Sequence, residues 1–157
     1  MTVRAFVLTV SDGVNAGKRE DKSGVALGEL LAASGFAVTR SVVADEEDEI
    51  ENAIRQALDG NELIVTTGGT GFGHRDVTPE ATSRVIEREA PGLVHMMMSK
   101  GIESTPMAAL SRATAGSVGD TLVINVPGST KGAMENLQAV IDLIPHALDL
   151  LAGDTEH

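Results

Sequence analysis

A buried strand that runs directly into a glycine-rich loop is the feature that most constrains the fold of this chain. Residues 63–65 are Leu-Ile-Val, and residues 66–76 then read Thr-Thr-Gly-Gly-Thr-Gly-Phe-Gly-His-Arg-Asp before Pro79 opens a predicted helix. Glycines permit positive φ and leave backbone N–H groups uncovered, so such a loop can approach a phosphate closely. The helix N-terminus beyond the loop adds unpaired N–H donors and a positive dipole end. This segment therefore predicts an anion-binding turn.

The rest of the chain alternates between apolar runs of strand length and stretches with helical periodicity. After a first strand and a polar loop over residues 11–22, the alternation continues to a long closing helix. A short hairpin around Gly119-Asp120 adds an antiparallel strand. The predicted strands are residues 3–10, 36–43, 63–66, 114–118 and 121–126, and the predicted helices are residues 23–34, 45–58, 79–89, 93–100 and 133–151. This order predicts an α/β fold, a three-layer sandwich with a mostly parallel sheet and a short antiparallel hairpin. Its ligands should bind beyond the carboxyl ends of the strands.

Length and composition favour one domain, residues 1–157, with no metal or disulfide needed to stabilise its core. The chain has no cysteine, which excludes thiolate catalysis and cysteine-based metal sites and suits a cytoplasmic protein. The net charge of −11 and the 2% aromatic content argue against a nucleic-acid binder. We see no signal peptide and no apolar stretch long enough to span a membrane, so no membrane partner is expected.

Two aspartates are candidate ligands of Mg²⁺. Asp76 follows the glycine loop and either favours the next helix N-terminus or holds Mg²⁺ beside a bound phosphate, while Arg75 can pair with that phosphate or with Asp76. Asp45 ends the loop after the second strand, so it is either an N-cap of the following acidic helix or a second carboxylate near the glycine loop. Residues 46–49 are better explained as acidic residues in the first turn of that helix.

Further polar groups follow the first and last strands of the predicted sheet. Asp12, Asp21 and Ser23 lie after the first strand, where ordinary solvated loop polarity is the alternative to ligand binding. Ser129 and Lys131 offer a hydroxyl and a cation suited to phosphate, with a surface helix cap as the alternative. The glycine loop matches neither a Walker A loop nor a dinucleotide fingerprint, and the histidines lack zinc-ligand spacing.

Together these segments resemble the small molybdopterin-binding domain of the Mog/MoaB family over nearly the whole chain. The most specific part is residues 66–82, where the glycine loop is joined to Arg-Asp-Val-Thr-Pro-Glu. The matching segments are Ser11-Asp12, Asp21-Lys22-Ser23-Gly24, Asp45-Glu46, residues 66–71, Arg75-Asp76-Val77-Thr78-Pro79-Glu80-Ala81-Thr82, Ser111-Arg112 and Val126-Pro127-Gly128-Ser129.

The resemblance implies an adenylyltransferase of molybdenum cofactor biosynthesis. Such an enzyme transfers AMP from Mg-ATP to the terminal phosphate of molybdopterin and releases pyrophosphate. It implies that Asp45 and Asp76 are catalytic and hold Mg²⁺, and that the loops hold ligand phosphates and pterin. The implied binding residues are Asp12, Ser23, Thr67, Gly68, Gly69, Thr70, Gly71, Arg75, Pro127, Gly128, Ser129 and Lys131. Thr130 replaces the proline common at this position in the family, which makes that loop less rigid.

The same resemblance leaves alternatives and implies partners. The chain is either the enzyme or a non-catalytic paralogue that carries molybdopterin, and an unrelated nucleotide-binding regulator is a third hypothesis. Retention of both Asp45 and Asp76 favours the enzyme, because two acids would repel anionic ligands unless a metal intervenes. Family members are commonly trimers, with hexamers in one branch, so we expect a homotrimer, with residues 93–98 and 107–110 as contacts. A molybdenum insertase is a further possible partner.

Overall fold

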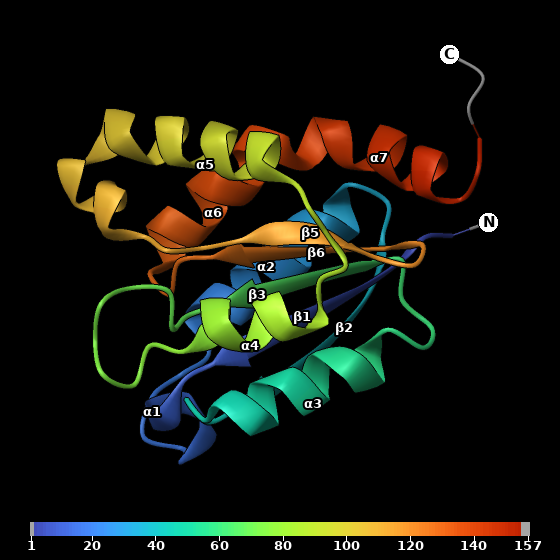
Figure 1. The fold of residues 1–157 in the computed structure, drawn as a ribbon. Coiled ribbons are helices and arrows are strands. Elements are labelled where there is room, and N and C mark those ends of the chain that lie inside the picture. Colours follow the sequence, from blue (N-terminus) through green and yellow to red (C-terminus); the bar gives the residue numbers. More distant parts are fainter. Residues whose placement is uncertain (1, 155–157) are drawn as a thin grey trace.

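The central sheet has the strand order β2-β1-β3-β6-β5-β4 in the computed structural model, which describes residues 2–154 (Figure 1). The three pairs β1–β2, β1–β3 and β3–β6 are parallel, whereas β5 is antiparallel to both β6 and β4. This arrangement confirms the predicted mostly parallel sheet with an antiparallel hairpin. The strands are β1 Arg4–Val10, β2 Ala37–Val43, β3 Leu63–Thr67, β4 Arg88–Glu89, β5 Ala115–Val118 and β6 Thr121–Val126.

Helices cover both faces of the sheet, which confirms the three predicted layers (Figure 1). One layer contains α2, α5, α6 and α7, and the other contains α3 and α4. In the described residues, no helix combines the length and apolarity that crossing a membrane requires. The helices are α1 Asp12–Asn15, α2 Lys22–Ala33, α3 Glu47–Ala57, α4 Thr78–Val85, α5 Pro91–Ser104 and α6 Thr130–Val140, then α7 Ile144–Leu151, with 3₁₀ segments η1 Pro106–Leu110 and η2 Ile141–Leu143.

Alternation along the strands divides the core into two clusters. In β3, Leu63 and Val65 face the α2/α5/α6/α7 layer, whereas Ile64 faces the α3/α4 layer. All three side chains are fully buried, as expected of a strand in the middle of a sheet with helices on both faces. The continuous apolar run that identified this strand in the sequence is a consequence of that burial.

The strand order places the predicted site residues along one edge of the sheet. From β1 the chain proceeds to β2 on one side, and it then returns to place β3 on the other side of β1. The loops after β1 and β3 therefore diverge, and this switch in strand order is where open α/β sheets bind ligands. The glycine loop follows β3, Asp12 follows β1, Asp45 follows β2 and Pro127 follows β6.

The predicted helix over residues 79–89 is wrong over its last four residues, 86–89. Helix α4 ends at Val85, and Ile86 adopts extended φ and ψ of −63° and 131°. Arg88 and Glu89 then pair with Ser117 and Gly116 of β5, and Gly116 permits this because a Cβ there would collide with Arg88 O. A long-range strand pairing thus overrides the helix propensity of Glu-Arg-Glu.

The predicted closing helix over residues 133–151 is interrupted. Helix α6 begins earlier, at Thr130, and the 3₁₀ segment Ile141–Leu143 separates it from α7. Pro145 lies in the first turn of α7, where its missing N–H removes an α-helical bond to the preceding turn. Two smaller differences are the α1 turn within the predicted polar loop and the longer extent of α5.

Candidate functional site

The glycine loop is held in a conformation that only glycine adopts easily at two positions. Gly68 and Gly69 have φ of +103° and +68°. A Cβ on Gly68 would collide with the carbonyl oxygen of Val10, and the Gly68 Cα lies 3.2 Å from the position of a Cβ on Gly128. Gly68 N also donates to Val126 O at 3.2 Å. The turns after β1, β3 and β6 therefore meet at Gly68 with no room for a side chain.

The Asp45 carboxylate reaches the glycine loop. Its Oδ2 accepts from Asp12 N at 2.8 Å, and Asp12 Oδ1 accepts from Asp45 N at 3.0 Å, so the loops after β1 and β2 are joined reciprocally. A Cβ on Gly69 would lie 3.2 Å from Asp45 Oδ1. Burial raises the pKa of Asp45, and the nearby charges of Asp12 and Asp76 add to the effect. The N-cap alternative is wrong, because Glu46 occupies that position in α3.

Asp76 lies under the same loop from the other end. Its Oδ2 accepts from Gly73 N at 2.9 Å, and Cβ atoms on Gly71 and Gly73 would lie 3.0 and 2.9 Å from it. Asp76 directly precedes Val77, the N-cap of α4, so the alternative that its charge favours this helix N-terminus stays open. Oδ1 of both Asp45 and Asp76 accepts no hydrogen bond from the part of the chain that the structure describes.

Arg75 pairs with two other carboxylates and not with Asp76. Its Nε and Nη2 each lie 3.0 Å from an oxygen of Asp12, and its Nη1 lies 2.9 Å from Glu46 Oε1. The hydrogen bonds that Arg75 donates to Asp12 and Glu46 raise the pKa of Arg75, and the Arg75 guanidinium lowers the pKa of Asp12. Of the two partners expected for Arg75, Asp76 is therefore wrong, and the pairs that form instead connect the glycine loop to the loops after β1 and β2.

The Arg112 side chain supports the glycine loop through hydrogen bonds. The sequence indicated this residue only as part of the Ser-Arg motif. Its Nε donates to Gly71 O and its Nη2 to Asp76 O, both at 2.7 Å, and its Nη1 contacts Glu80 Oε2 at 2.7 Å. The guanidinium also lies 5.6 Å from the centroid of the Phe72 ring. A fork of parallel N–H groups is suited to two carbonyls and a carboxylate, but no local pattern links Arg112 to a loop so distant in sequence.

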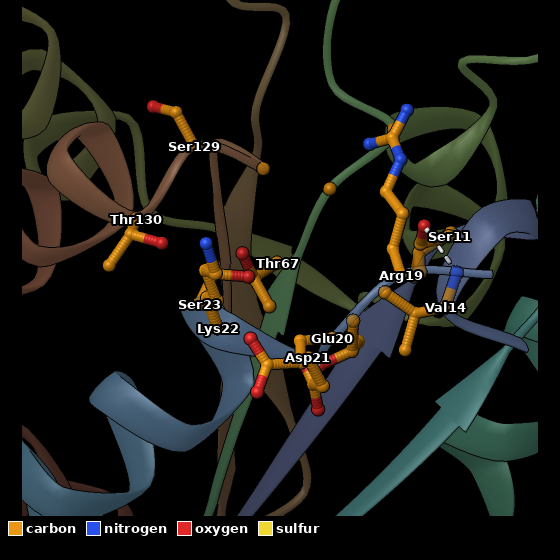
Figure 2. A pocket seen from close by; sticks show the side chains of 15 residues that line it. Ser11, Val14, Arg19, Glu20, Asp21, Lys22, Ser23, Thr67, Ser129 and Thr130 are labelled. Atoms are coloured by element: carbon orange, nitrogen blue, oxygen red, sulfur yellow. Dashed lines mark hydrogen bonds between the residues drawn. The ribbon is translucent and has the colours of Figure 1, made fainter. Parts of the chain in front are cut away.

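A polar cavity of about 600 Å³ opens beside Gly68 and Gly69 (Figure 2). Figure 2 shows Arg19 on one side and Ser129 and Thr130 on the other, with Ser23 and Thr67 between them. The predicted binding residues in its wall are Ser23, Thr67, Gly68, Gly69, Gly128 and Ser129. The hydroxyl and backbone groups of these residues can form hydrogen bonds with a ligand, as the few polar groups of a ligand pocket commonly do.

A second, mainly apolar cavity of about 430 Å³ lies on the other side of Ser129. It is lined by Thr70, Gly71, Pro127 and Lys131 from the predicted set, together with exposed Phe72, Met107 and Leu110. Ser129 lines both cavities. Asp12, Asp45, Arg75 and Asp76 line neither cavity, so the structure divides the predicted residues between two cavities and an acidic cluster at the glycine loop.

Two predicted polar residues also cap helices. Ser129 accepts from Gly132 N and is the N-cap of α6, and Asp21 accepts from Gly24 N and is the N-cap of α2. Asp21 further accepts from Thr9 Oγ1 at 2.8 Å and pairs with Arg40 at 3.2 Å. The capping alternative is thus correct for Ser129, but capping does not remove it from the cavity wall.

Comparison with known proteins gives consistent matches over nearly the whole chain. The family described as "Probable molybdopterin binding domain" matches residues 6–146. The molybdopterin adenylyltransferase of Helicobacter pylori strain J99 is 39% identical over 98% of this chain and 90% of its own length. The molybdenum cofactor synthesis protein cinnamon of Drosophila melanogaster is 43% identical over 94% of this chain, which spans 25% of that protein.

Solved structures agree with this comparison. The molybdopterin biosynthesis enzyme MoaB from Thermus thermophilus superimposes with a TM-score of 0.91 and is 47% identical. The superposition covers 97% of this chain and 98% of that one.

Proposed function

The chain belongs to the molybdopterin-binding domain family, and we propose that it transfers AMP from Mg-ATP to the terminal phosphate of molybdopterin. A phosphate oxygen of molybdopterin attacks the α-phosphorus of ATP, the bond between the α-phosphorus and the bridging oxygen breaks, and pyrophosphate leaves. The products are adenylyl-molybdopterin and pyrophosphate. The reaction belongs to molybdenum cofactor biosynthesis.

The observation that carries this proposal is the pair of carboxylates at the glycine loop. Asp45 and Asp76 come from loops after different strands, yet both approach glycines of the same turn. Each has one oxygen in a backbone hydrogen bond and one without a protein partner in the described residues. Two carboxylates beside an anion-binding turn would repel a phosphate, so a cation between them is the arrangement that makes chemical sense.

The donor set fits Mg²⁺. This ion is commonly held by one or two carboxylates, while substrate phosphates and waters complete its octahedron. Within the described residues no cluster of three or more His, Cys, Asp or Glu could form an all-protein metal cage, which suits this mode of binding. Asp45 and Asp76 would hold the ion, and when bound it would neutralise charge on phosphate oxygens.

The chain's own groups supply positioning and further charge neutralisation. Phosphoryl-type transfer needs little covalent participation by the protein, so preorganised donors account for most of the catalysis. The backbone of Gly68 and Gly69 is open to the approach of a ligand. Arg112 holds the carbonyl groups of Gly71 and Asp76, which enclose the second part of the glycine loop. The two cavities share Ser129, which suits a reaction that must bring two substrates into contact.

Pyrophosphate release tests the proposal directly. We expect release from Mg-ATP only when molybdopterin is also present, and we expect Asp76→Asn to reduce it by more than about 100-fold. Asparagine keeps the size of the side chain and an acceptor for Gly73 N, so the loop should stay folded. Asp120→Asn, on the exposed turn between β5 and β6, is the matched control and should leave the rate unchanged. Molybdopterin binding without any release would instead identify a carrier.

Assembly, location and domain extent complete the proposal. We expect one domain over residues 1–157, a cytoplasmic location and a homotrimer, with a hexamer or an insertase complex as further states. Met97 is buried in the core, but Met96, Met107 and Leu110 are 41%, 66% and 49% exposed and could form subunit contacts. Light scattering of the purified protein measures the molar mass of the assembly and so tests for the trimer. Met107→Glu should shift the measured mass toward that of the monomer.

A further inference from the structure

Most cations of this acidic chain already have a carboxylate partner. The ion pairs of the described residues use Arg4, Arg40, Arg55, Arg75, Arg84, Lys100, Arg112 and Lys131. The cations left without such a pair in this part of the chain are Lys18, Arg19, Lys22 and Arg88. With 23 acidic residues against 12 basic ones, a basic side chain is expected to find an acidic neighbour. The unpaired set is therefore informative.

Three of these four unpaired cations fall within one short segment. Lys18 and Arg19 lie in the turn after α1, and Lys22 is the first residue of α2. Arg19 and Lys22 line the polar cavity. Figure 2 shows the Arg19 side chain extended at this cavity, across from Ser129 and Thr130. A cavity wall of hydroxyls with two unpaired cations at its rim is complementary to a phosphate group.

The acidic residues of the same segment do not cancel this charge. Asp21 is already satisfied by Gly24 N, the Thr9 hydroxyl and the Arg40 guanidinium. Glu20 also lines the cavity, but it forms no ion pair with either neighbouring cation. The two cations at the cavity therefore outnumber the single uncompensated carboxylate beside them.

Lys131 does not supply a cation to the polar cavity, although its position in the sequence predicts that it binds phosphate. It lines the apolar cavity and not the polar one, its side chain is 80% exposed, and its Nζ lies 3.9 Å from Glu135. The cationic contribution to the polar cavity must then come from another segment. Arg19 and Lys22 are the Lys and Arg residues that line it.

We propose that Arg19 and Lys22 bind a phosphate group of a substrate in the polar cavity. This inference rests on the proposed function, which supplies two sources of that chemistry, the phosphate chain of ATP and the terminal phosphate of molybdopterin. Both cations act by charge and hydrogen bonding alone, and no covalent step involves them.

Binding of pyrophosphate and of α,β-methylene-ATP, each with Mg²⁺, tests the inference without turnover. We expect the Arg19→Gln/Lys22→Gln double variant to bind at least one probe roughly 10- to 100-fold more weakly than wild type in calorimetry, with a shallower dependence on salt. Arg88→Gln is the matched control, since it removes an exposed, unpaired charge on β4, away from the cavity, and should change affinity less than twofold. Thermal unfolding checks that all variants remain folded.

Each result bears on the inference separately from the proposed function. Two binding results would overturn the inference: the double variant binds both probes with wild-type affinity, or wild type binds neither probe. The exception to both is a double variant that raises the KM for molybdopterin alone. That last pattern identifies the molybdopterin phosphate as the occupant, whereas a raised KM for ATP alone identifies the nucleotide. Normal turnover with unchanged KM for both substrates in the double variant refutes the inference and leaves the proposed function intact. Probe binding that depends on Arg19 and Lys22, in a wild-type protein without any turnover, supports the inference and refutes the proposed function.

Discussion

Replacing Gly69 with alanine should show that the glycine loop requires glycine because of crowding as well as backbone conformation. Gly69 has φ of +68°, and a Cβ there would collide with Thr78 Oγ1 and lie 3.2 Å from Asp45 Oδ1. Gly17 provides the matched control, because its φ is +74° and a Cβ there would meet nothing within 4 Å. Both substitutions carry the same conformational cost and the same change in unfolded-chain entropy. The difference between them isolates the collision.

The magnitude follows from the contacts that must break. An alanine in the left-handed region costs about 1–2 kcal/mol, which is the whole effect expected for Gly17→Ala. In Gly69→Ala the Thr78 hydroxyl must also move away from the Gly68 carbonyl, to which it donates at 2.9 Å in a buried position. Leaving that buried carbonyl unsatisfied adds about 1–3 kcal/mol. We therefore expect Gly69→Ala to lower the free energy of unfolding by roughly 2–5 kcal/mol in total.

Urea denaturation measures the free energy of unfolding of both variants. The protein concentration is kept fixed, because assembly would make the denaturation midpoint depend on it. A double-mutant cycle with Thr78→Ala then tests the named collision. Removing the hydroxyl should make the Gly69→Ala cost approach that of Gly17→Ala, so the coupling energy should be about 1 kcal/mol or more. Equal costs for Gly17→Ala and Gly69→Ala, or additive effects of Gly69→Ala and Thr78→Ala, would refute this reasoning.

Three further predictions concern buried polarity and the Arg112 contacts. Asn125→Ala should cost about 2–4 kcal/mol of unfolding free energy in urea, because the fully buried amide bonds two threonine hydroxyls and a backbone N–H, whereas exposed Asn15→Ala should cost less than about 0.5 kcal/mol. Arg112 lowers the pKa of Glu80 below its ordinary 4.5, so their pair stabilises the fold above that pH and loses its effect as the pH falls through the lowered value. The stability difference between wild type and Glu80→Gln should accordingly shrink toward acid pH, and a difference that grows would contradict the assignment. Arg112→Lys should lower AMP transfer roughly 10- to 100-fold, since an ammonium cannot hold the Asp76 carbonyl and Glu80 together, and added guanidine should partly rescue Arg112→Ala.

The parts of the fold that the sequence predicts are those governed by local physics. Strand β3 is an apolar run because both faces of its strand are buried, and Gly35 ends α2 with φ of +97° because glycine tolerates that conformation. The parts that fail depend on distant partners. Residues 88–89 become a strand only because β5 lies beside them, and the closing helix breaks where Pro145 deprives the preceding turn of a hydrogen bond.

The site shows the same division between local and distant effects. The glycine loop and Asp76 adjoin one another in sequence, so their proximity could be predicted from the motif. Arg112 could not be assigned a role, because its three partners lie 32–41 positions away along the chain and nothing local marks them. The division of the binding residues between two cavities is likewise a property of packing, since it depends on where the α6 N-terminus meets the turn at Gly68.

The reciprocal bonds between Asp12 and Asp45 give the site a rigidity that neither aspartate predicts alone. Each carboxylate accepts the backbone N–H of the other residue, and Arg75 extends the connection from Asp12 to the glycine loop. The loops after β1, β2 and β3 are thereby joined before any ligand arrives, while Asp45 Oδ1 stays without a protein partner among the described residues. Preorganised groups cost no reorganisation when charge develops during a reaction. Asp12 therefore contributes most through positioning Asp45, because its own carboxylate is already occupied by Asp45 N and Arg75.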